Sequence, residues 1–452
     1  MEDKNIQGTV KEIAPRKNLG FWALWALGVG SVVGDGIFLL LGQGVQVAGP
    51  SSVLVFAVAG IIQAIVMISL AELAVGMPSA GAMSVWIDRF LGGWWGYLAG
   101  FGFTAGWIIA GGSTGIALGT LTCWYFPGLN QELWTVLFGI IFLTIFAALN
   151  VFGAAIAART QLIMVLALLA VMVVFGIATM PSVETSDLTP FAPYGIAGCM
   201  AALPLGTYAY QGAVTLTTAG DECKDVRNLP KALVWSSITF IVVYTVCMIG
   251  VLGIIPWDQI SMAESPFTLA AAKVFGKAAG FIMNSAGWLA AATCIIMGTL
   301  YSSSRVFYHM AKVGQMPKVF GEMNPKTRTP VKGVIIIWAL SVAMVLLGTI
   351  NADLVYVTLS NQITITYAVI WILALVAAIR YRMKCPDEVK AGGFKMPLFP
   401  VLPVIGIIGV AFVLYTCISS YLTSVILTVI WMALLYVYYR LVVKKKEHLE
   451  TY

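Results

Sequence analysis

An acidic residue inside an apolar stretch is the first feature of this sequence that could do chemistry. The stretch GVGSVVGDGIF, residues 28–38, contains Asp35 together with four glycines. A carboxylate in such surroundings has three possible uses. It can cap the start of a helix, it can carry a proton, or it can pair as an anion with a cationic amine. The sequence leaves these three possibilities open.

A second stretch, ALPLGTYAYQGAVTLTTAG at residues 202–220, combines a helix breaker with polar side chains. Pro204 disrupts a regular helix, while Tyr208, Tyr210 and Gln211 supply hydroxyl and amide groups. The two tyrosines flank the expected disruption, so they are candidates for substrate binding or gating. Further candidates for gating or coupling are Trp107 and Asn284, which lie in two other apolar runs.

Residue types that bind metals or catalyse hydrolysis do not cluster. The seven cysteines are scattered and lie mostly within or at the ends of apolar runs, and His309 and His448 stand far from each other. We interpret the cysteines as small packing residues. We therefore expect no metal site and no cofactor. Neither histidine lies within an apolar run and Asp35 has no evident intramembrane acidic partner, so we do not expect an enzyme.

The elements that position these residues must cross a membrane. Of the 452 residues, 60% are hydrophobic and only 10% are charged, far from the balance of a soluble domain. A helix needs about 20 apolar residues to cross the hydrocarbon core. Twelve such runs are predicted, at residues 21–44, 50–76, 92–123, 133–152, 159–180, 194–218, 232–255, 279–303, 332–350, 353–379, 399–419 and 421–440.

The distribution of basic residues predicts the orientation. With twelve spans, every lysine and arginine falls on the side of the two termini, apart from Lys273 and Lys277. Basic residues concentrate in cytoplasmic loops. We therefore expect a multi-pass protein of the cytoplasmic membrane with both termini in the cytoplasm. The net charge of +6 is explained by that membrane surface, and nucleic acid is not an expected partner.

The first and sixth runs are both interrupted by helix-breaking residues, and they correspond if the first ten spans form two inverted repeats. In lipid a broken helix is tolerated only where it faces protein or a polar cavity. Paired interruptions in matching halves point to a binding site near the middle of the membrane. Glycines also serve close helix packing, which is our interpretation of GGSTG at residues 111–115.

Four motifs carry a family resemblance. GVGSVVGDGIF resembles the first-helix signature of the amino acid–polyamine–organocation (APC) transporters. AELAVGMPSAGA at residues 71–82, GDECKDVRNLPKAL at 220–233 and SSRVFYHMAKVGQMPKVF at 303–320 are similar to segments of the same family, in the same order. The resemblance implies twelve transmembrane helices with the LeuT-type fold, in which two inverted repeats of five helices are followed by two further helices and helices 1 and 6 are broken.

This fold divides the chain as follows: residues 1–20 form a cytoplasmic segment, 21–180 the first repeat, 194–379 the second repeat, 399–440 the last two helices, and 441–452 a cytoplasmic tail. The resemblance also places the substrate between the two broken helices. A carboxylate would be held near Ser31, Gly34, Asp35 and Gly36, and an ammonium near Val29 and Gly30 and the sixth-helix residues Tyr208, Ala209, Tyr210, Gln211 and Gly212. The gating or coupling candidates remain Asp35, Trp107, Tyr208, Tyr210 and Asn284.

Asp35 departs from the family pattern, which has serine or threonine at this position. An ionised carboxylate 4 Å from a substrate carboxylate would cost roughly 4 kcal/mol at an effective dielectric constant of 20. Leu168 stands where proton-coupled members often carry a lysine. Proton coupling through Asp35 and exchange both remain open, and we do not expect a sodium site.

The sequence therefore predicts a secondary transporter, a permease or exchanger, that moves small amino acids by alternating access. The alternative is a transporter of a small cationic amine or polyamine that lacks a carboxylate and pairs with Asp35. A second acid for a diamine is not evident, and no filter motif of a channel is present.

Overall fold

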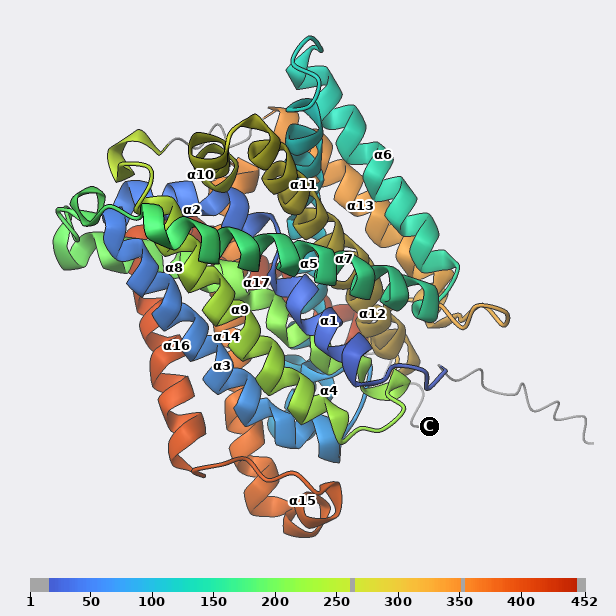
Figure 1. Ribbon diagram of the computed structural model, residues 1–452. Coiled ribbons are helices and arrows are strands. Elements are labelled where there is room, and N and C mark those ends of the chain that lie inside the picture. Colours follow the sequence, from blue (N-terminus) through green and yellow to red (C-terminus); the bar gives the residue numbers. More distant parts are fainter. Residues whose placement is uncertain (1–15, 261–264, 351–353, 445–452) are drawn as a thin grey trace, which may run out of the picture.

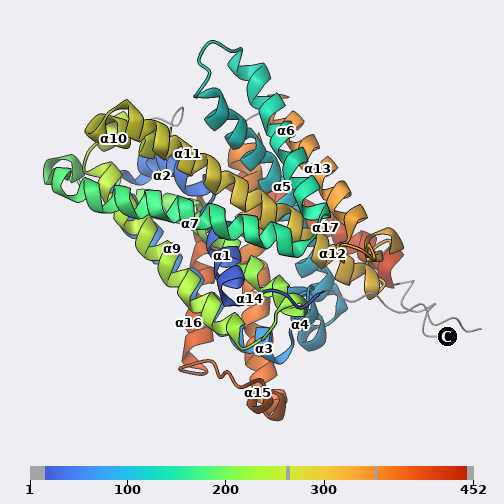
Figure 2. The ribbon, with the colours of Figure 1, turned by 45° about the vertical axis from the view of Figure 1, so that its right-hand side comes forward.

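The protein is built of helices. The computed structural model describes residues 16–260, 265–350 and 354–444. Within these ranges the regular elements are helices, and an isolated bridge between Leu19 and Cys223 is the one β feature. Figures 1 and 2 show long helices that cross one another in a single bundle. The predicted all-α fold is confirmed.

Long α-helices alternate with short 3₁₀ and π segments along the chain. The first half of the chain contains α1 (Phe21–Val32), α2 (Asp35–Ala48), η1 (Gly49–Ser51), α3 (Ser52–Gly76), α4 (Met83–Leu91), α5 (Gly93–Cys123), α6 (Gln131–Val151), α7 (Ala154–Thr179), η2 (Met180–Ser182), η3 (Thr185–Leu188), α8 (Gly195–Tyr210) and η4 (Gln211–Glu222). The second half contains α9 (Asn228–Leu252), η5 (Trp257–Gln259), α10 (Pro266–Phe275), α11 (Lys277–Thr293), η6 (Cys294–Ser302), α12 (Ser303–Lys312), η7 (Lys318–Gly321), α13 (Val331–Ile350), η8 (Leu354–Leu359), α14 (Ser360–Lys384), α15 (Pro386–Gly392), α16 (Val401–Ser420), α17 (Leu422–Tyr438) and η9 (Tyr439–Val443).

Eleven helical stretches in the described part of the chain are long and apolar enough to cross a membrane. Lipid offers no hydrogen-bond partners to the backbone, whereas a helix pairs its N–H and C=O groups internally. Apolar runs therefore form helices in a membrane. The run predicted at residues 194–218 is not among the eleven. It is divided into α8, with 16 residues, and η4, a 12-residue 3₁₀-helix with little apolar character. The count of twelve spans stays a prediction.

The first run is divided between two helices, α1 and α2. α1 ends at Val32, the N–H of Val33 donates to the carbonyl of Val29 at 2.8 Å, and α2 begins at Asp35. Between the two helices Gly34 has an extended backbone, with φ −124° and ψ −161°. The chain therefore changes course at residues 33–34, in the middle of an apolar segment.

The sixth run changes its helix type instead of opening. α8 contains Pro204, and at Gln211 the chain passes from α-helix to the 3₁₀-helix η4. A 3₁₀-helix has strained hydrogen bonds and seldom exceeds four residues, so longer stretches often mark a functional hinge. A second irregular segment is η6, nine residues of π-helix between α11 and α12. π segments are also frequent at functional sites.

The irregular segments lie next to one another. α1 packs against η4, α7 and α9, and η4 in turn packs against η6, while α2 packs against α8. Segments from the two predicted repeats are thus in direct contact, and Figure 2 shows α1 next to α7 and α9. The division of the chain into two inverted repeats stays a prediction.

Several basic residues lie at one end of the bundle. α4 and α15 lie at one end, with Arg89, Arg382 and Lys384 beside them, and α10 lies at the opposite end (Figure 1). Lys273 and Lys277, the two exceptions in the predicted charge pattern, sit at the corner between α10 and α11. We refer to the α4–α15 end as the basic end.

Candidate functional site

The two interrupted segments meet at glycines. A Cβ atom added to Gly212 would overlap the carbonyl oxygen of Ser31, and one added to Gly36 would lie 3.4 Å from the Cα atom of Ala209. A Cβ atom on Gly34 would lie 2.9 Å from the Sγ atom of Cys294. These glycines allow the α1–α2 junction to approach η4 and α8 at backbone distance and to pack against the Cys294 side chain of η6.

A small cavity lies at this meeting point. Its volume is about 30 Å³, which is room for one or two water molecules. The α1–α2 junction, α5, the α8–η4 junction and η6 each contribute to its wall. The lining residues are Ser31, Val32, Gly34, Gly36, Trp107, Ala110, Thr114, Tyr208, Ala209, Gln211, Gly212 and Cys294.

Three buried polar atoms of the cavity wall have no hydrogen-bond partner among the described residues. They are the hydroxyl of Ser31, the indole nitrogen of Trp107 and the side-chain carbonyl oxygen of Gln211. The three residues are 2%, 5% and 7% exposed. Buried polar atoms are bonded in the great majority of cases, because an unmade bond costs about 1–3 kcal/mol. Two possible donors and an acceptor therefore belong to residues that line one small space.

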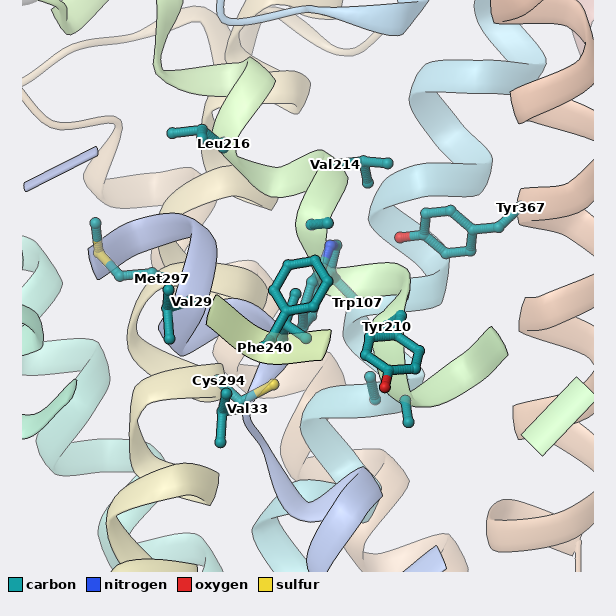
Figure 3. Packing of buried hydrophobic residues seen from close by; sticks show 14 of the residues in the cluster. Val29, Val33, Trp107, Tyr210, Val214, Leu216, Phe240, Cys294, Met297 and Tyr367 are labelled. Carbon is teal, nitrogen blue, oxygen red and sulfur yellow. The ribbon is translucent and has the colours of Figure 1, made fainter. Parts of the chain in front are cut away.

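η6 holds the indole of Trp107 in place. The hydroxyl of Thr299 donates to the backbone carbonyl of Trp107 at 3.2 Å. A Cβ atom on Gly298 would overlap the indole ring, so the ring lies directly against the π segment. Figure 3 shows the indole in the same region as Cys294 and Val33. The position of the N–H donor is thus fixed by packing.

Most of the residues predicted for substrate binding line this cavity. They are Ser31, Gly34, Gly36, Tyr208, Ala209, Gln211 and Gly212, joined by the gating candidate Trp107. Val29, Gly30, Tyr210 and Asn284 are not part of the lining. Each of these four residues makes contacts elsewhere in the structure.

Val29 and Gly30 serve the end of α1. The carbonyl of Val29 accepts the N–H of Val33, so it is already engaged in a hydrogen bond. Gly30 faces α7, where a Cβ atom would overlap the amide of Gln161. That amide group is buried and lies 3.5 Å from the carbonyl of Ala26. The predicted ammonium contact of these two residues gains no support from this arrangement.

Tyr210 points away from the cavity. Its ring packs against Phe240 and Tyr244, with centroid distances of 5.4 and 5.1 Å, and Figure 3 shows it beside Phe240. Asn284 lies elsewhere on α11, where its amide donates to the carbonyl of Leu121 at 2.9 Å. The gating roles predicted for Tyr210 and Asn284 find no geometric support.

Asp35 is the first residue of α2, next to the cavity-lining Gly34 and Gly36. The position of its side chain lies outside what the structure describes. Helix capping, proton transfer and pairing with an amine therefore remain three hypotheses about this carboxylate.

Four lining residues were not predicted: Val32, Ala110, Thr114 and Cys294. Thr114 belongs to the GGSTG stretch, which we interpreted as packing. Hydroxyl groups among glycines could have indicated a binding site. Glycine allows another segment to approach closely, and a hydroxyl group can form hydrogen bonds with a ligand. Cys294 carries no such signal. It reaches the cavity because η6 packs against η4, and only the tertiary structure shows this.

A buried ion pair closes the basic end of the same helices. Glu222, the last residue of η4, accepts a hydrogen bond from the guanidinium of Arg305 in α12, and both residues are buried. The guanidinium also stacks 3.5 Å from the ring centroid of Tyr301. The backbone carbonyl of Glu222 accepts the N–H groups of Asn18 and Leu19, both at 3.0 Å. The segment before α1 is thereby bound to the end of η4.

Comparison with known proteins bears on what such a site does. Residues 19–443 match the model of a family described as amino acid permease. The chain is 28% identical over 450 residues to the amino-acid permease RocE of Bacillus subtilis, covering 94% of each protein. It is 27% identical over 429 residues to the uncharacterized amino acid permease YtnA of the same organism, covering 91% of this chain and 92% of that protein. It is 24% identical over 397 residues to the D-serine/D-alanine/glycine transporter of Escherichia coli K12, covering 85% and 84%.

Proposed function

The chain belongs to the amino acid permease family, and from this premise we propose that it carries small zwitterionic amino acids through the cavity between the α1–α2 and α8–η4 junctions. Membership confirms the predicted APC resemblance and the prediction of a membrane transporter, not an enzyme. The chemistry of the cavity supports the more specific proposal.

The three unpartnered polar atoms carry this proposal. An amino acid presents a carboxylate, which accepts hydrogen bonds, and an ammonium group, which donates them. The indole N–H of Trp107 and the hydroxyl of Ser31 can donate to the carboxylate, and the side-chain carbonyl of Gln211 can accept from the ammonium. Hydrogen bonds to charged groups contribute about 1.5–3 kcal/mol each.

The size of the cavity supports a small side chain. Ala110, Ala209 and Cys294 form part of its wall, and its volume of about 30 Å³ must already expand to admit glycine or alanine. The name of the Escherichia coli relative, a D-serine/D-alanine/glycine transporter, fits substrates of that size. A bulky aromatic substrate would require a larger rearrangement of the wall.

Contacts that close the basic end support alternating access. At the basic end, the Glu222–Arg305 pair and the bonds from Asn18 and Leu19 join η4, α12 and the segment before α1. Access from that side requires these contacts to separate. We place this end and both termini in the cytoplasm, because basic residues concentrate there, and the protein in the cytoplasmic membrane.

The alternative predicted from the sequence is transport of a small amine that pairs with Asp35. The experiment must distinguish this alternative from amino acid transport. Substrate uptake into proteoliposomes is measured for glycine and alanine against methylamine and ethylamine, which lack only the carboxylate. We expect uptake of the amino acids and little of the amines. Uptake of the amines instead, lost in Asp35→Ser, would overturn the amino-acid proposal. Acidification of the lumen during uptake would indicate proton coupling, and its absence together with trans-stimulation would indicate exchange.

A further inference from the structure

A second cavity opens at the basic end, between the start of α9 and the end of α15 with the residues that follow it. Its volume is about 400 Å³, within the range of ligand pockets in proteins. The α9 side contributes Arg227, Pro230, Lys231, Val234 and Trp235, and the opposite wall consists of Gly392, Gly393 and Phe394. None of these residues takes part in the site described above.

The cavity carries two cations that no described acidic side chain neutralises. Arg227 and Lys231 are both exposed, and neither forms an ion pair with a described residue. Asp225 is the nearest acid in sequence, and its carboxylate accepts the backbone N–H of Arg227 at 3.0 Å. The side chains of Arg227 and Lys231 are therefore available to an anion.

The acids of α15 are engaged elsewhere. Glu388 binds Arg89 at 2.7 Å, and Asp387 lies 3.5 Å from Lys390. The positive end of α9, a helix of 25 residues that begins at Asn228, adds to the attraction for an anion. The two basic side chains and the backbone at the start of α9 thus both give the cavity a positive electrostatic potential.

An apolar face continues from the cavity along α9. Lys231, Trp235, Ile238 and Val242 are spaced by four, three and four residues, so they share one face of the helix. Trp235, Ile238 and Val242 are 57%, 46% and 54% exposed, and they belong to a stretch apolar enough to cross a membrane. A lysine followed one helical turn later by a tryptophan is typical of the membrane interface, where the lipid headgroups meet the hydrocarbon core.

We propose that this cavity binds the headgroup of an anionic phospholipid whose acyl chain lies along the Trp235–Ile238–Val242 face of α9. The phosphate binds Arg227 and Lys231, and the glycerol lies against Gly392 and Gly393. A soluble anion would use the two cations but not the apolar face, which is the reason that we assign a lipid. The proposal depends on the membrane embedding of the chain and not on the transported substrate.

Lipid titration of the purified full-length protein tests this assignment. The melting temperature is measured in mild detergent with dioleoyl phosphatidylglycerol and with dioleoyl phosphatidylcholine. We expect the phosphatidylglycerol to raise the melting temperature, and its apparent affinity to fall roughly tenfold in the double variant Arg227→Gln/Lys231→Gln. Equal stabilisation by both lipids, or an unchanged affinity in the double variant, would overturn the proposal.

A matched control and a soluble probe complete the test. Lys318→Gln/Lys384→Gln removes the same charge at the same end from exposed residues that do not line the cavity, and it should bind phosphatidylglycerol like the unmodified protein. Trp235→Ser should weaken binding through the loss of the apolar face. Glycerol phosphate, which has the anion without acyl chains, should not stabilise the protein. If it stabilises as well as the lipid does, the site binds a soluble anion and the lipid assignment is wrong.

Discussion

The carbonyl oxygen of Ser31 and the α-carbon of Gly212 lie in backbone contact, and no side chain fits between them at residue 212. Ser31 belongs to the last turn of α1 and Gly212 to the first turn of η4. The two segments that the sequence predicts to be interrupted therefore touch where their helices change course. The cavity lies beside this contact, since both residues line it.

We expect Gly212→Ala to lose transport and stability. The added methyl group must displace a backbone carbonyl, which cannot rotate away as a flexible side chain would. Overpacking of this kind typically costs about 1–3 kcal/mol. The measurements are the melting temperature of the purified variant and its amino acid uptake in proteoliposomes.

Gly333→Ala provides the control for this substitution. A Cβ atom on Gly333 would lie 3.6 Å from the Cβ atom of Ser304, an ordinary contact, and Gly333 is likewise buried within a helix. This variant should keep both its stability and its uptake. A Gly212→Ala protein that behaves in the same way would show that α1 and η4 do not depend on their close approach.

Trp107→Phe should weaken substrate binding. The substitution keeps an aromatic ring and removes the unpartnered indole N–H, together with the part of the indole that lies against Gly298. A hydrogen bond to a carboxylate contributes about 1.5–3 kcal/mol, so we expect the affinity for glycine or alanine to fall by roughly tenfold or more. Substrate-dependent thermal shift reports the affinity, and the melting temperature without substrate reports the stability.

Trp371→Phe is the matched control, because Trp371 is also a buried indole without a hydrogen-bond partner among the described residues, but it does not line the cavity. Its substitution should leave the substrate affinity unchanged. An equal loss of affinity in both variants would mean that the indole of Trp107 acts through packing and not as a donor.

The sequence singled out several of the positions at which the backbone itself forms the cavity wall. Gly34, Gly36 and Gly212 disrupt helices and permit close approach, so their positions marked the meeting point directly. Side-chain direction was harder to predict. Tyr208 and Tyr210 are two residues apart in a helix and must point to different sides. Only the packing of α8 shows that Tyr208 faces the cavity while Tyr210 faces Phe240.

Residues brought in by distant segments could not be inferred from local patterns. Cys294 lines the cavity as the first residue of a π segment that packs against η4, and the sequence CIIMGTLYS gives no sign of this geometry. For Asn284 the local pattern suggested a function, because a polar side chain lies in an apolar run. In the structure its amide donates a hydrogen bond to the carbonyl of Leu121 and joins α11 to α5.

Breaking the buried pair of Glu222 and Arg305 should destabilise the protein strongly. In Glu222→Gln the guanidinium stays buried without its counter-charge, and removal of one partner of such a pair typically costs about 3–5 kcal/mol. The double variant Glu222→Leu/Arg305→Met removes both charges and should recover most of the lost stability. The melting temperatures of the two variants test this expectation. A double variant no more stable than the single one would show that the hydrogen-bond geometry, and not charge burial, controls the cost.

The double variant also separates stability from gating. The pair joins η4 to α12 at the basic end, and its loss removes an attraction that opposes opening. We therefore expect the double variant to fold while spending more time open at that end. If uptake and opening both match the unmodified protein, the pair has a structural role alone.

The thiol of Cys223 offers a direct measure of that opening. Cys223 follows Glu222 and is 1% exposed. Burial, and next the negative charge of Glu222, raise the pKa of this thiol to about 12. The folded-state pKa lies above the ordinary value, so the reactive thiolate is depleted at every pH below it. We expect maleimide to label Cys223 far more slowly than the half-buried Cys199 and Cys385, as measured by peptide mass spectrometry.

Opening of the basic end should increase this labelling, and the pH dependence identifies the cause. In Glu222→Leu/Arg305→Met the bonds that hold Asn18 and Leu19 to residue 222 remain possible, because they use its backbone carbonyl. A gain that comes only from the lost charge would shift the pH profile of the labelling rate to lower pH. A gain that comes from opening would raise the rate at every pH and would be reversed by a substrate that closes this end. Labelling of Cys223 as fast as that of Cys199 in the unmodified protein would show that the segment before α1 does not cover the end of η4 in solution.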